Sequence, residues 1–560
     1  MKDFSKEIEA YALKNALEFG KADPGRILPK LFSHGLDKKD IKNIMPEIVK
    51  IVKEINTLAA GEREKRFASL QKYVKEAQEE KKGLPELANV NPRMVFRLAP
   101  YPSGALHLGN AKTYVLNALY AEKYKGKTLL VMDDTIGSEE KKIAPEAYGL
   151  IEDAFSWLKV LYEKPVIYKS DRLKLYYDYG EKLLDLGKSY ICHCSQEVLR
   201  KNRMEGKDCA CRDLEVKEQK KRWKEMFSME KGQAVMRLKT SMQHPNPAFR
   251  DRVLFKISDR EHPRVGKKYR VWPTLEMSWA VDDHDLGITH ILRGNDLMIE
   301  SDMEKFIWDI FDWKHPIIIH TGLVTIEGAG AKLSKSKAQA EVASGEFTGW
   351  DDPRTWSVQS LRRRGFMPEA LRSFIEEIGL NKQDITIPIE TLYSCNRKMI
   401  DSLASRYSFV EDPVEVIMQK APVTNMISLP VHPDQKETRD VKSSPIFISS
   451  GDAKKYKGQE VRLLHLYNLT LAKSIKGKKI QGIFTSSENK NIQKLQWVSE
   501  SVNARILMPD GTWLEGLAEK AITGLQTGNV IQFERFGFVR FDGVVKKKGK
   551  AAYEFWFGHK

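Results

Sequence analysis

The first ninety residues alternate apolar and polar positions with the period of an α-helix. Apolar residues recur every three or four positions over residues 8–19, after Ser5 as a candidate N-cap, and again over residues 41–55. The next residues, 62–82, are almost wholly charged, which is typical of an exposed helix or a linker. The pattern predicts a helical N-terminal extension over residues 1–90.

Short apolar runs then alternate with helical segments. Residues 94–98 and 128–132 have the composition of buried strands, and between them the apolar residues of 111–119 fall on one face of a helix. A strand, a loop rich in Gly and Pro, a helix and a second strand form a βαβ unit. The sequence therefore predicts a parallel α/β domain from about residue 91.

Beyond about Val410 the helical period fades. Pro, Gly and β-branched residues punctuate short strands such as 504–508 and 530–533, and regularly spaced short strands predict one or two β-barrels. No apolar run reaches the roughly 18 residues of a membrane span, and residues 1–7 carry acids where a signal segment would be apolar. We therefore expect neither secretion nor contact with a membrane.

Length, charge and cysteine count narrow the class of protein. The chain has 560 residues, whereas single cores stop growing at about 250 to 300, so three or more modules are expected. Five cysteines argue against a disulfide framework and for the reducing cytoplasm. The net charge of +16 favours a polyanionic partner such as nucleic acid. Charge alone does not separate this from lysines that only keep a protein in solution.

Two segments far apart carry candidate chemistry. The first predicted strand runs into the loop 99–106 and a helix that begins at about His107, and the free N–H groups of a helix N-terminus attract a triphosphate. Gly109 permits close approach, while His107 and Asn110 offer hydrogen-bond donors. Taken alone, this segment also fits a structural histidine that caps the helix.

The second segment places Lys332 and Lys335 in a Gly-rich setting. Lysines on a mobile loop can close over a pyrophosphate and stabilise charge that grows in a transition state, although alone they also fit a solvated loop. Together the segments resemble the His-Ile-Gly-His and Lys-Met-Ser-Lys-Ser signatures of the class I aminoacyl-tRNA synthetases, which here read His107-Leu108-Gly109-Asn110 and Lys332-Leu333-Ser334-Lys335-Ser336.

The specific resemblance is to the glutamyl-tRNA synthetases of archaeal type, from the N-terminal helices to the C-terminus. Blocks in register with that group's pattern cover residues 97–104, 133–135, 168–172, 281–290, 292–294 and 349–354. The resemblance implies a tRNA-contacting helical extension over 1–90, a Rossmann-type catalytic domain over 91–330 with an acceptor-binding insertion at about 190–270, a signature loop and helical connecting domain over 331–400, and a β-barrel anticodon-binding domain over 401–560.

The resemblance also implies a two-step reaction and a monomeric enzyme. The α-carboxylate of L-glutamate attacks the α-phosphate of ATP, and the terminal ribose hydroxyl of tRNA(Glu) then takes the acyl group; a second acceptor, tRNA(Gln), stays open. The implied catalytic residues are His107, Asn110, Lys332 and Lys335. ATP, accompanied by Mg²⁺, is implied to contact Pro100, Tyr101, Ser103, Gly104, His107, Gly109, Asn110 and Lys335.

Glutamate presents two carboxylates and one ammonium group. Arginines clamp carboxylates and an acid holds an amine, and the resemblance assigns Arg97 and Arg293 to the carboxylates and Asp133 with Thr135 to the ammonium. Arg293 argues against the rival enzyme, a glutaminyl-tRNA synthetase. A buried guanidinium facing a neutral amide loses its partner, at a cost of about 3 to 5 kcal/mol.

Several positions depart from the family's pattern. Ile136 replaces an acid, Tyr101 replaces a smaller polar residue, and Leu275 stands where many relatives carry a substrate-binding tyrosine. Asn110 replaces the usual second histidine, and this change leaves open a synthetase-like protein that binds RNA without charging it. Because Leu275 lacks the hydroxyl of that tyrosine, no residue is assigned to this wall of the substrate pocket.

Four of the five cysteines form two C-x-C pairs. Thiolates at this spacing can close a tetrahedral Zn²⁺ site, and related synthetases carry a similar knuckle in the acceptor-binding insertion. The alternative is four reduced thiols. We expect His193 to be a bystander and Cys395 to serve packing. The expected ligands are Cys192, Cys194, Cys209 and Cys211.

The last strands interleave aromatic and basic residues over 531–540. This pattern suits stacking on the unpaired bases of an anticodon together with phosphate contact. A barrel core strand followed by a solvated hairpin explains the same residues. The resemblance therefore supports an anticodon-binding module and assigns no single aromatic residue to the RNA.

Overall fold

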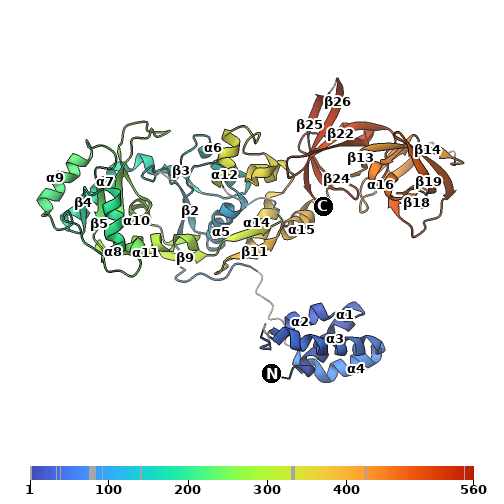
Figure 1. Cartoon of the computed structure of the whole chain (residues 1–560), viewed down its shortest axis with the longest axis horizontal. Helices are drawn as coiled ribbons and strands as arrows, with labels where there is room; N and C mark the ends of the chain where they lie inside the picture. The colour runs from blue at the N-terminus through green and yellow to red at the C-terminus, as the bar shows by residue number, and fades with distance from the viewer. Residues whose placement is uncertain are drawn as a thin grey trace. The chain divides into compact units, whose positions relative to one another are not determined.

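The computed structural model describes residues 3–32, 34–37, 40–74, 83–90, 92–138, 142–328, 335–422, 426–547 and 549–560. Residue contacts divide the chain into two compact units, Met1–Lys82 and Gly83–Lys560 (Figure 1). Among the helices of the described ranges, none combines the length and apolar character needed to cross a membrane.

The first unit is a bundle of helices. Its apolar stripes meet around Ile8, Ile27 and Ile48, which are fully buried or nearly so. The predicted N-cap is wrong, because Ser5 is the first helical residue, and its hydroxyl lies within hydrogen-bond distance of the Asp3 and Glu47 carboxylates. The elements are α1 (Ser5–Phe19), α2 (Pro24–Phe32), α3 (Ile41–Thr57), α4 (Ala60–Leu70) and η2 (Gln71–Tyr73).

The second unit begins with a five-stranded parallel sheet in the order β3-β2-β1-β8-β9. The chain leaves β1 toward β2 on one side and returns as β8 on the other, so the strand order reverses between β1 and β8. In open α/β sheets, ligands bind beyond the carboxyl ends of the strands at such a point. The strands are β1 (Val95–Leu98), β2 (Lys127–Met132), β3 (Glu163–Tyr168), β8 (His290–Gly294) and β9 (Ile317–Thr321).

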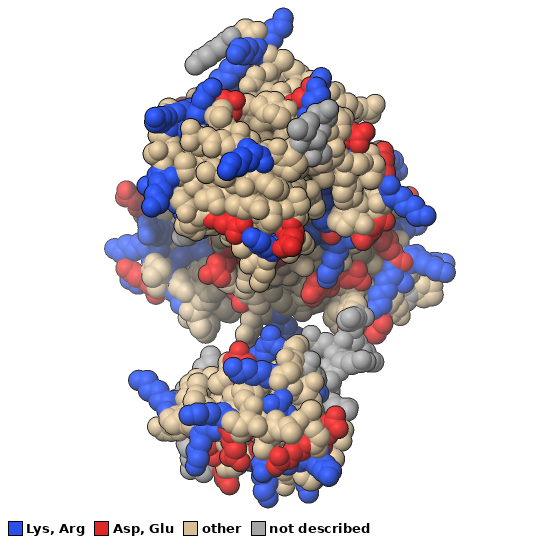
Figure 2. Space-filling view, turned by 90° about the vertical axis from the view of Figure 1, so that its right-hand side faces the viewer, with Lys and Arg blue, Asp and Glu red and all other residues tan. Residues whose placement is uncertain are grey.

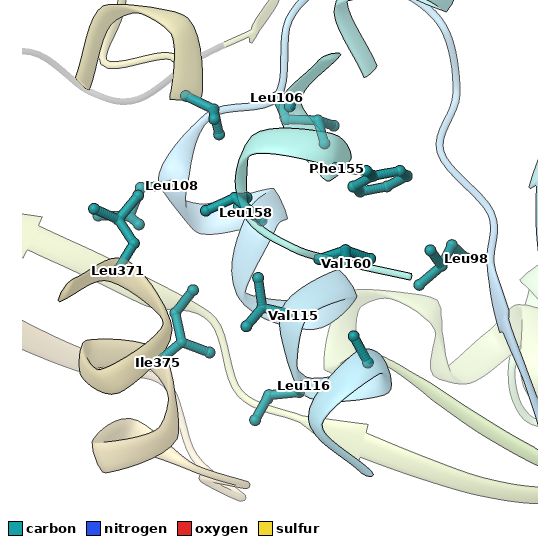
Figure 3. Packing of buried hydrophobic residues seen from close by; sticks show 14 of the residues in the cluster. Leu98, Leu106, Leu108, Val115, Leu116, Phe155, Leu158, Val160, Leu371 and Ile375 are labelled. Atoms are coloured by element: carbon teal, nitrogen blue, oxygen red, sulfur yellow. The ribbon is translucent and has the colours of Figure 1, made fainter. Parts of the chain in front are cut away.

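Helix α5 connects β1 to β2 and is the helix of the predicted βαβ unit. Leu108, Val115 and Leu116 on α5 belong to one buried cluster with Phe155 of α6 and Leu371 of α14 (Figure 3). Burial of each such side chain contributes roughly 1.5 to 3 kcal/mol. This packing holds the N-terminus of α5 just beyond the end of β1. The helices are α5 (Leu108–Tyr124), α6 (Ala147–Trp157) and α14 (Pro368–Ile378).

A second, antiparallel sheet in the order β4-β5-β6-β7 lies between β3 and β8 in the chain, where the insertion at about 190–270 is predicted. Trp223 and Phe255 are buried in the core that this sheet shares with its helices. The elements are η3 (Lys169–Asp171), α7 (Leu173–Asp185), β4 (Ser189–Cys192), α8 (Gln196–Glu205), α9 (Val216–Met226), β5 (Val235–Leu238), η4 (Pro247–Phe249), β6 (Val253–Ile257) and β7 (Val271–Pro273).

Helices then lead from β7 back into the parallel sheet and on toward the C-terminal part. Strands β10 and β11 pair with each other beside these helices. The elements are α10 (Leu275–Asp285), η5 (Asn295–Leu297), α11 (Met298–Ile310), β10 (Val324–Glu327), α12 (Lys335–Ala343), η6 (Pro353–Thr355), α13 (Val358–Arg363), β11 (Ile385–Pro388) and α15 (Ile389–Ile400).

Beyond α15 the described chain is almost entirely β-structure, in two barrel-like sheets and a hairpin (Figure 1). The seven-stranded sheet has the order β12-β24-β25-β26-β22-β23-β13, the six-stranded sheet has the order β17-β14-β20-β19-β18-β21, and β15 pairs with β16. The predicted multidomain fold, with a parallel α/β catalytic domain and a C-terminal β region, is thereby confirmed.

The elements of this region are β12 (Arg406–Tyr407), β13 (Phe409–Glu411), β14 (Pro413–Gln419), β15 (Met426–Pro430), β16 (Thr438–Lys442), β17 (Ile446–Ser449), α16 (Ser450–Lys455), β18 (Glu460–Leu463), β19 (Asn468–Lys476), β20 (Lys479–Ser486), β21 (Lys494–Leu495), β22 (Ser501–Leu507), β23 (Trp513–Glu519), η7 (Lys520–Gly524), β24 (Val530–Phe533), β25 (Gly537–Lys547) and β26 (Lys550–His559).

The connecting helices are fixed to the C-terminal strands by two arginines. Arg364, which is fully buried, donates to the carbonyl oxygens of Phe557 and Gly558 at 3.0 and 2.8 Å. Arg363 pairs with Asp542 of β25. The seven-stranded sheet is therefore anchored to the segment that follows the signature loop.

Candidate active site

Two buried arginines stand near the carboxyl ends of β1 and β8, where the strand order reverses. Arg97 is the third residue of β1 and Arg293 the fourth of β8, and their side chains are only 6% and 4% exposed. Both guanidinium groups approach the Asp283 carboxylate of α10. The fold thus brings together two predicted substrate residues that are 196 positions apart in the chain (293 − 97).

Asp283 holds Arg97. Nε and Nη2 of Arg97 donate to the two carboxylate oxygens of Asp283, with 3.1 Å between Nη2 and Oδ2. Burial disfavours the charged guanidinium, but the carboxylates of Asp283, Glu304 and Asp133 outweigh it and raise the pKa of Arg97 above its ordinary value. Arg97 therefore stays a cation, and its Nη1 lies outside the Asp283 pair.

Glu304 of α11 holds Arg293. Nη1 and Nη2 of Arg293 each lie 2.8 Å from a Glu304 oxygen, and Nη1 also donates to the Ser301 hydroxyl. Burial raises the pKa of Glu304, and Arg293 opposes this effect. Nε of Arg293 is buried and has no hydrogen-bond partner among the described residues. An unpaired buried donor is costly, so this atom is suited to meet a ligand.

Asp133 directly follows β2, and Lys169 directly follows β3. Nζ of Lys169 lies 3.0 Å from Oδ1 of Asp133 and donates to the Ser278 hydroxyl at 2.9 Å. Despite this ion-pair distance, Oδ1 of Asp133 makes no hydrogen bond within the described ranges. Thr135, also buried, lies two residues further along the same loop. Four neighbouring strands thus contribute three cations and Asp133, while α10 and α11 contribute the carboxylates of Asp283 and Glu304.

Asp134 fixes the loop that carries Asp133. Its carboxylate accepts hydrogen bonds from the backbone N–H and hydroxyl of Ser170 at 2.9 and 2.7 Å and from the Tyr148 hydroxyl at 3.1 Å. Burial raises the pKa of Asp134, and these donors oppose the rise. Nε2 of His262 lies 2.7 Å from the Asp134 carbonyl oxygen, so a neutral ring donates there. Asp134 therefore fixes the position of Asp133.

The loop after β1 carries the predicted ATP-contacting residues. The backbone N–H of Asp133 donates to the carbonyl oxygen of Pro100 at 3.0 Å, which ties this loop to the end of β2. Gly104 has a φ of +148°, and a Cβ at this position would lie 2.1 Å from the Trp350 ring. Any larger residue would displace the loop or the indole, so the loop conformation depends on Gly104.

Tyr101 and Ser103 are half-buried on the same loop. The backbone N–H of Ser103 donates to the Tyr101 carbonyl oxygen at 2.9 Å, which closes a tight turn. Burial raises the pKa of Tyr101, and Asp133 adds to the rise, so the tyrosine is a neutral hydroxyl beside the charge cluster. The structure thus brings Tyr101 close to Asp133, one of the predicted substrate residues.

His107 takes the N-cap position of α5. Its Nδ1 accepts a long hydrogen bond of 3.4 Å from the backbone N–H of Asn110. Gly109 lies under the His107 ring, because a Cβ there would come within 3.1 Å of the imidazole. The Asn110 side chain is exposed. His107 therefore caps α5, as the sequence allowed, and its ring lies at the helix N-terminus where a phosphate is expected.

The second signature segment is only partly described. Strand β10 ends at Glu327 and α12 begins at Lys335. Lys332 and the side chain of Lys335 lie outside the described residues. Leu275, the first residue of α10, is half-buried.

The four predicted zinc ligands come together at the edge of the antiparallel sheet. Cys192 ends β4, and Cys209 lies beyond α8. All four sulfur atoms, of Cys192, Cys194, Cys209 and Cys211, lie within 4.8 Å of one another. A tetrahedral Zn²⁺ with Zn–S bonds of about 2.3 Å needs sulfur atoms about 3.8 Å apart, and Cys192 and Cys209 are 3.7 Å apart. The donor set fits zinc.

Polar side chains surround the cysteine cluster. Nη1 of Arg237 lies 3.9 Å from the Cys209 sulfur, and the Gln219 side chain bonds the backbone at Ile191 and Cys211. The hydrogen bond from Cys192, together with Tyr190 and Arg237, lowers the pKa of Cys209 to about 5. Among the described residues, the group of side chains close enough to hold a metal consists of the four cysteines and does not include His193.

A pocket of about 780 Å³ opens between the two barrel-like sheets. Basic residues from both sheets and from the loops between them line it, and His465 lies 3.7 Å from Glu534 across it. Cations around a concave surface suit a polyanion such as RNA. The lining residues are Arg406, Leu464, His465, Asn491, Ile492, Gln493, Lys494, Gln532, Glu534 and Arg535.

The sequence did not predict three residues of the charge cluster. Asp283 and Glu304 pair with the two predicted substrate arginines, and Lys169 pairs with Asp133. Asp283 and Lys169 are inside blocks that carry the family resemblance, but nothing in the sequence paired them with Arg97 or Asp133. Glu304 lies in an ordinary amphipathic helix. The available signal was an acid at a position that helical periodicity assigns to the buried face, because a buried carboxylate needs a cation.

The comparisons with known proteins agree over almost the whole chain. The model of the catalytic domain of class I tRNA synthetases for E and Q matches residues 93–402, and two models of their anticodon-binding domains match residues 404–488 and 488–542.

The chain is 39% identical to the glutamate–tRNA ligase of Pyrococcus furiosus, over 97% of this chain and 98% of that protein. It is 40% identical to that of Pyrococcus horikoshii, over 98% and 99%, and 37% identical to that of Methanocaldococcus jannaschii, over 95% and 96%. With the parallel sheet, the buried arginines and the two β modules in place, the chain belongs to the class I tRNA synthetases of the E and Q group.

Proposed function

We propose that this protein is a glutamate–tRNA ligase. It activates L-glutamate with ATP, presented as its Mg²⁺ complex, and transfers the acyl group to the 3′ end of tRNA(Glu). The observation that carries the proposal is the pair of buried arginines at the strand-order reversal, together with the Asp133 carboxylate, whose Oδ1 is ion-paired with Lys169 and makes no hydrogen bond among the described residues. This constellation complements a small molecule with two carboxylates and one ammonium group.

The residues of the strand ends bind and orient glutamate. Arg97 and Arg293 offer cationic donors for the two carboxylates, and Oδ1 of Asp133 accepts from the ammonium, with Thr135 nearby. An oxygen of the α-carboxylate attacks the α-phosphate of ATP, and pyrophosphate leaves. The terminal ribose hydroxyl of tRNA then attacks the acyl carbon, and AMP leaves. Fixing these groups in advance lowers the barrier without a covalent intermediate on the enzyme.

The loop after β1 and the start of α5 bind the nucleotide. Pro100, Tyr101, Ser103 and Gly104 form the loop, and His107, Gly109 and Asn110 form the helix start, where N–H groups attract phosphate. His107 and Asn110 are the catalytic residues on this side. Lys332 and Lys335 of the signature loop supply the positive charge that offsets charge developing on the phosphates.

The C-terminal pocket and the antiparallel insertion contact tRNA. Arg406, Lys494 and Arg535 line the pocket, where they meet phosphates and unpaired bases of the anticodon loop. Figure 2 shows Lys and Arg side chains spread over the face in view with Asp and Glu among them. On the face in view the basic residues form no single broad patch, and the proposed anticodon contacts are those of the pocket. The insertion holds the acceptor end, and the helices of residues 1–74 add a further tRNA contact.

Zinc stabilises the insertion. The four cysteine sulfurs, within 4.8 Å of one another, would hold it as thiolates, beside the Arg237 cation. A structural Zn²⁺ supplies folding free energy to a short segment with little core of its own. Cys192 ends a strand of the antiparallel sheet, whereas Arg97 and Arg293 belong to the parallel sheet, so the role of the metal would be to shape the insertion.

Charging assays with both amino acids and both tRNAs test the proposal. Labelled glutamate should be esterified to tRNA(Glu) with release of AMP, and glutamine should not. Charging with glutamine in its place would identify a glutaminyl-tRNA synthetase. Binding of tRNA without any AMP would identify a non-charging relative. Transfer of glutamate to tRNA(Gln) as well would widen the RNA range and leave the amino acid unchanged.

A further inference from the structure

Trp279 lies among the cations of the glutamate site, although nothing in the proposed mechanism uses it. The indole ring of this α10 residue lies 4.7 Å from the Arg97 guanidinium carbon, 4.6 Å from that of Arg293 and 5.1 Å from Nζ of Lys169. Its side chain is only 5% exposed. Attraction between the ring face and each cation helps to hold the guanidinium groups in place.

The indole N–H of Trp279 is buried and has no hydrogen-bond partner within the described ranges. Three other buried tryptophans of the described chain bond their indole N–H to the backbone. Nε1 of Trp308 donates to the Ala280 carbonyl oxygen at 2.9 Å, Trp272 donates to Tyr269 at 3.1 Å, and Trp497 donates to Leu464 at 2.9 Å. A polar group that a fold buries without a partner calls for an explanation, and a ligand is one.

Two more polar atoms of the same cluster make no hydrogen bond within the described ranges. Nε of Arg293, whose guanidinium lies against the Trp279 ring, is an unpaired donor. Oδ1 of Asp133 forms an ion pair with Nζ of Lys169 at 3.0 Å and makes no hydrogen bond among the described residues, so it can accept one from a ligand. Two donors and one acceptor match a molecule that brings carboxylate oxygens and an ammonium group. These three atoms, which make no hydrogen bond among the described residues, therefore point to one ligand of the chemistry already proposed.

We propose that Trp279 is a specificity-determining residue of the glutamate site, whose indole N–H donates to an oxygen of the side-chain carboxylate of bound glutamate while its ring holds Arg97 and Arg293. The inference rests on the proposed function. It also assigns the wall that Leu275 leaves open. Leu275 and Trp279 are four residues apart on α10 and so share a face, but leucine has no hydrogen-bonding group.

The donor set explains the choice of glutamate over glutamine. An indole nitrogen and a guanidinium can only donate, and a carboxylate can only accept. Glutamine would turn an NH₂ group toward donors that cannot accept its hydrogens, leaving buried groups unpaired on both sides. Sites built in this way discriminate strongly against the analogue that lacks the matching atom.

Trp279→Phe tests the N–H by itself, because phenylalanine keeps an aromatic face for the arginines. A hydrogen bond to a charged group corresponds to about 10- to 150-fold in affinity, so KM for glutamate should rise by about that factor. The kcat and the KM for ATP should stay within about threefold. The preference for glutamate over glutamine, as a ratio of kcat/KM, should fall by a similar factor.

Trp308→Phe is the matched control. It also removes a buried indole N–H from the catalytic domain, but this N–H is bonded to the backbone at Ala280. We expect a lower melting temperature and an unchanged KM for glutamate. If Trp279→Phe behaves like this control, with only stability affected, Trp279 is structural and the inference is overturned.

A second measurement needs no variant. In wild-type protein labelled with ¹⁵N-tryptophan, saturation with glutamate should move an indole N–H resonance that glutamine leaves in place. If none of the indole resonances of the eleven tryptophans responds, the inference fails even where Trp279→Phe does not fold. A wild-type protein that charges glutamate while these tests fail refutes the role of Trp279 alone. A wild-type protein that does not charge glutamate refutes the proposed function, and the role of Trp279 with it.

Discussion

Arg293→Cys should cost this enzyme both stability and glutamate recognition, because the guanidinium has one partner inside the protein and a second in the substrate. Both Nη atoms lie 2.8 Å from the fully buried Glu304 carboxylate. Removing one member of a buried ion pair costs about 3 to 5 kcal/mol, because the other charge stays buried without its partner. At about 2 to 4 °C per kcal/mol, the melting temperature of the catalytic domain should fall by roughly 6 to 20 °C.

A double variant separates the two losses. In Arg293→Cys combined with Glu304→Gln the orphan carboxylate is gone, so most of the lost stability should return. The KM for glutamate should stay raised, because the substrate-facing cation is still missing. Thermal unfolding monitored by fluorescence reports the first quantity, and charging of tRNA(Glu) with labelled glutamate reports the second.

Arg439→Cys is the matched control in the C-terminal region. Arg439 also forms a buried pair with a glutamate, Glu519, through two of its nitrogens. Its loss should lower stability and leave KM for glutamate unchanged. The reasoning is refuted if Arg293→Cys melts like the wild type, or if the double variant regains the wild-type KM together with its stability.

Three further outcomes are expected. Nε2 of His559 lies 3.0 Å from the Asn396 amide nitrogen, and burial lowers the pKa of His559 to about 4. In the unfolded chain this histidine binds a proton near pH 6.5. Protonation therefore favours the unfolded chain, and the free energy of unfolding should fall by roughly 3 kcal/mol as the pH drops from 6.5 to 4. Denaturant titrations at several pH values check this, and His559→Phe, with no group to titrate, should flatten that part of the profile. Cys209→Ser should abolish zinc retention, measured by elemental analysis, and loosen the insertion to protease; a metal content equal to wild type would contradict the site. Gly104→Ala places a methyl group 2.1 Å from Trp350 in the undisturbed fold, so KM for ATP should rise at least tenfold with KM for glutamate much less affected, and equal effects on both would contradict a nucleotide-loop role.

Much of the architecture follows from local pattern. The change from a helical period to alternating strands and helices, and then to short β-branched strands, predicts a helical extension, a parallel α/β domain and a C-terminal β region, and the structure confirms this order. The pattern succeeds because each segment's apolar face has to be buried within its own module. Local reasoning fails at Ser5, where contact with Glu47 of another helix outweighs the N-cap preference.

For the candidate site, the sequence indicates less, because it identifies residues but not their partners. The residue types were available from the chain itself, since the family resemblance assigns Arg97, Arg293 and Asp133, and the spacing of the cysteine pairs suggests a metal site. Their partners were not, because Asp283 pairs with Arg97 across 186 positions and Lys169 meets Asp133 only where the ends of β2 and β3 adjoin. Trp279 is one aromatic residue among many until α10 packs against the sheet. Sequence determines which groups exist and which segments form strands and helices. The tertiary structure alone decides which charges share a buried space, because strand order and helix packing set the distances on which pairing energy and the cost of an unpaired atom depend.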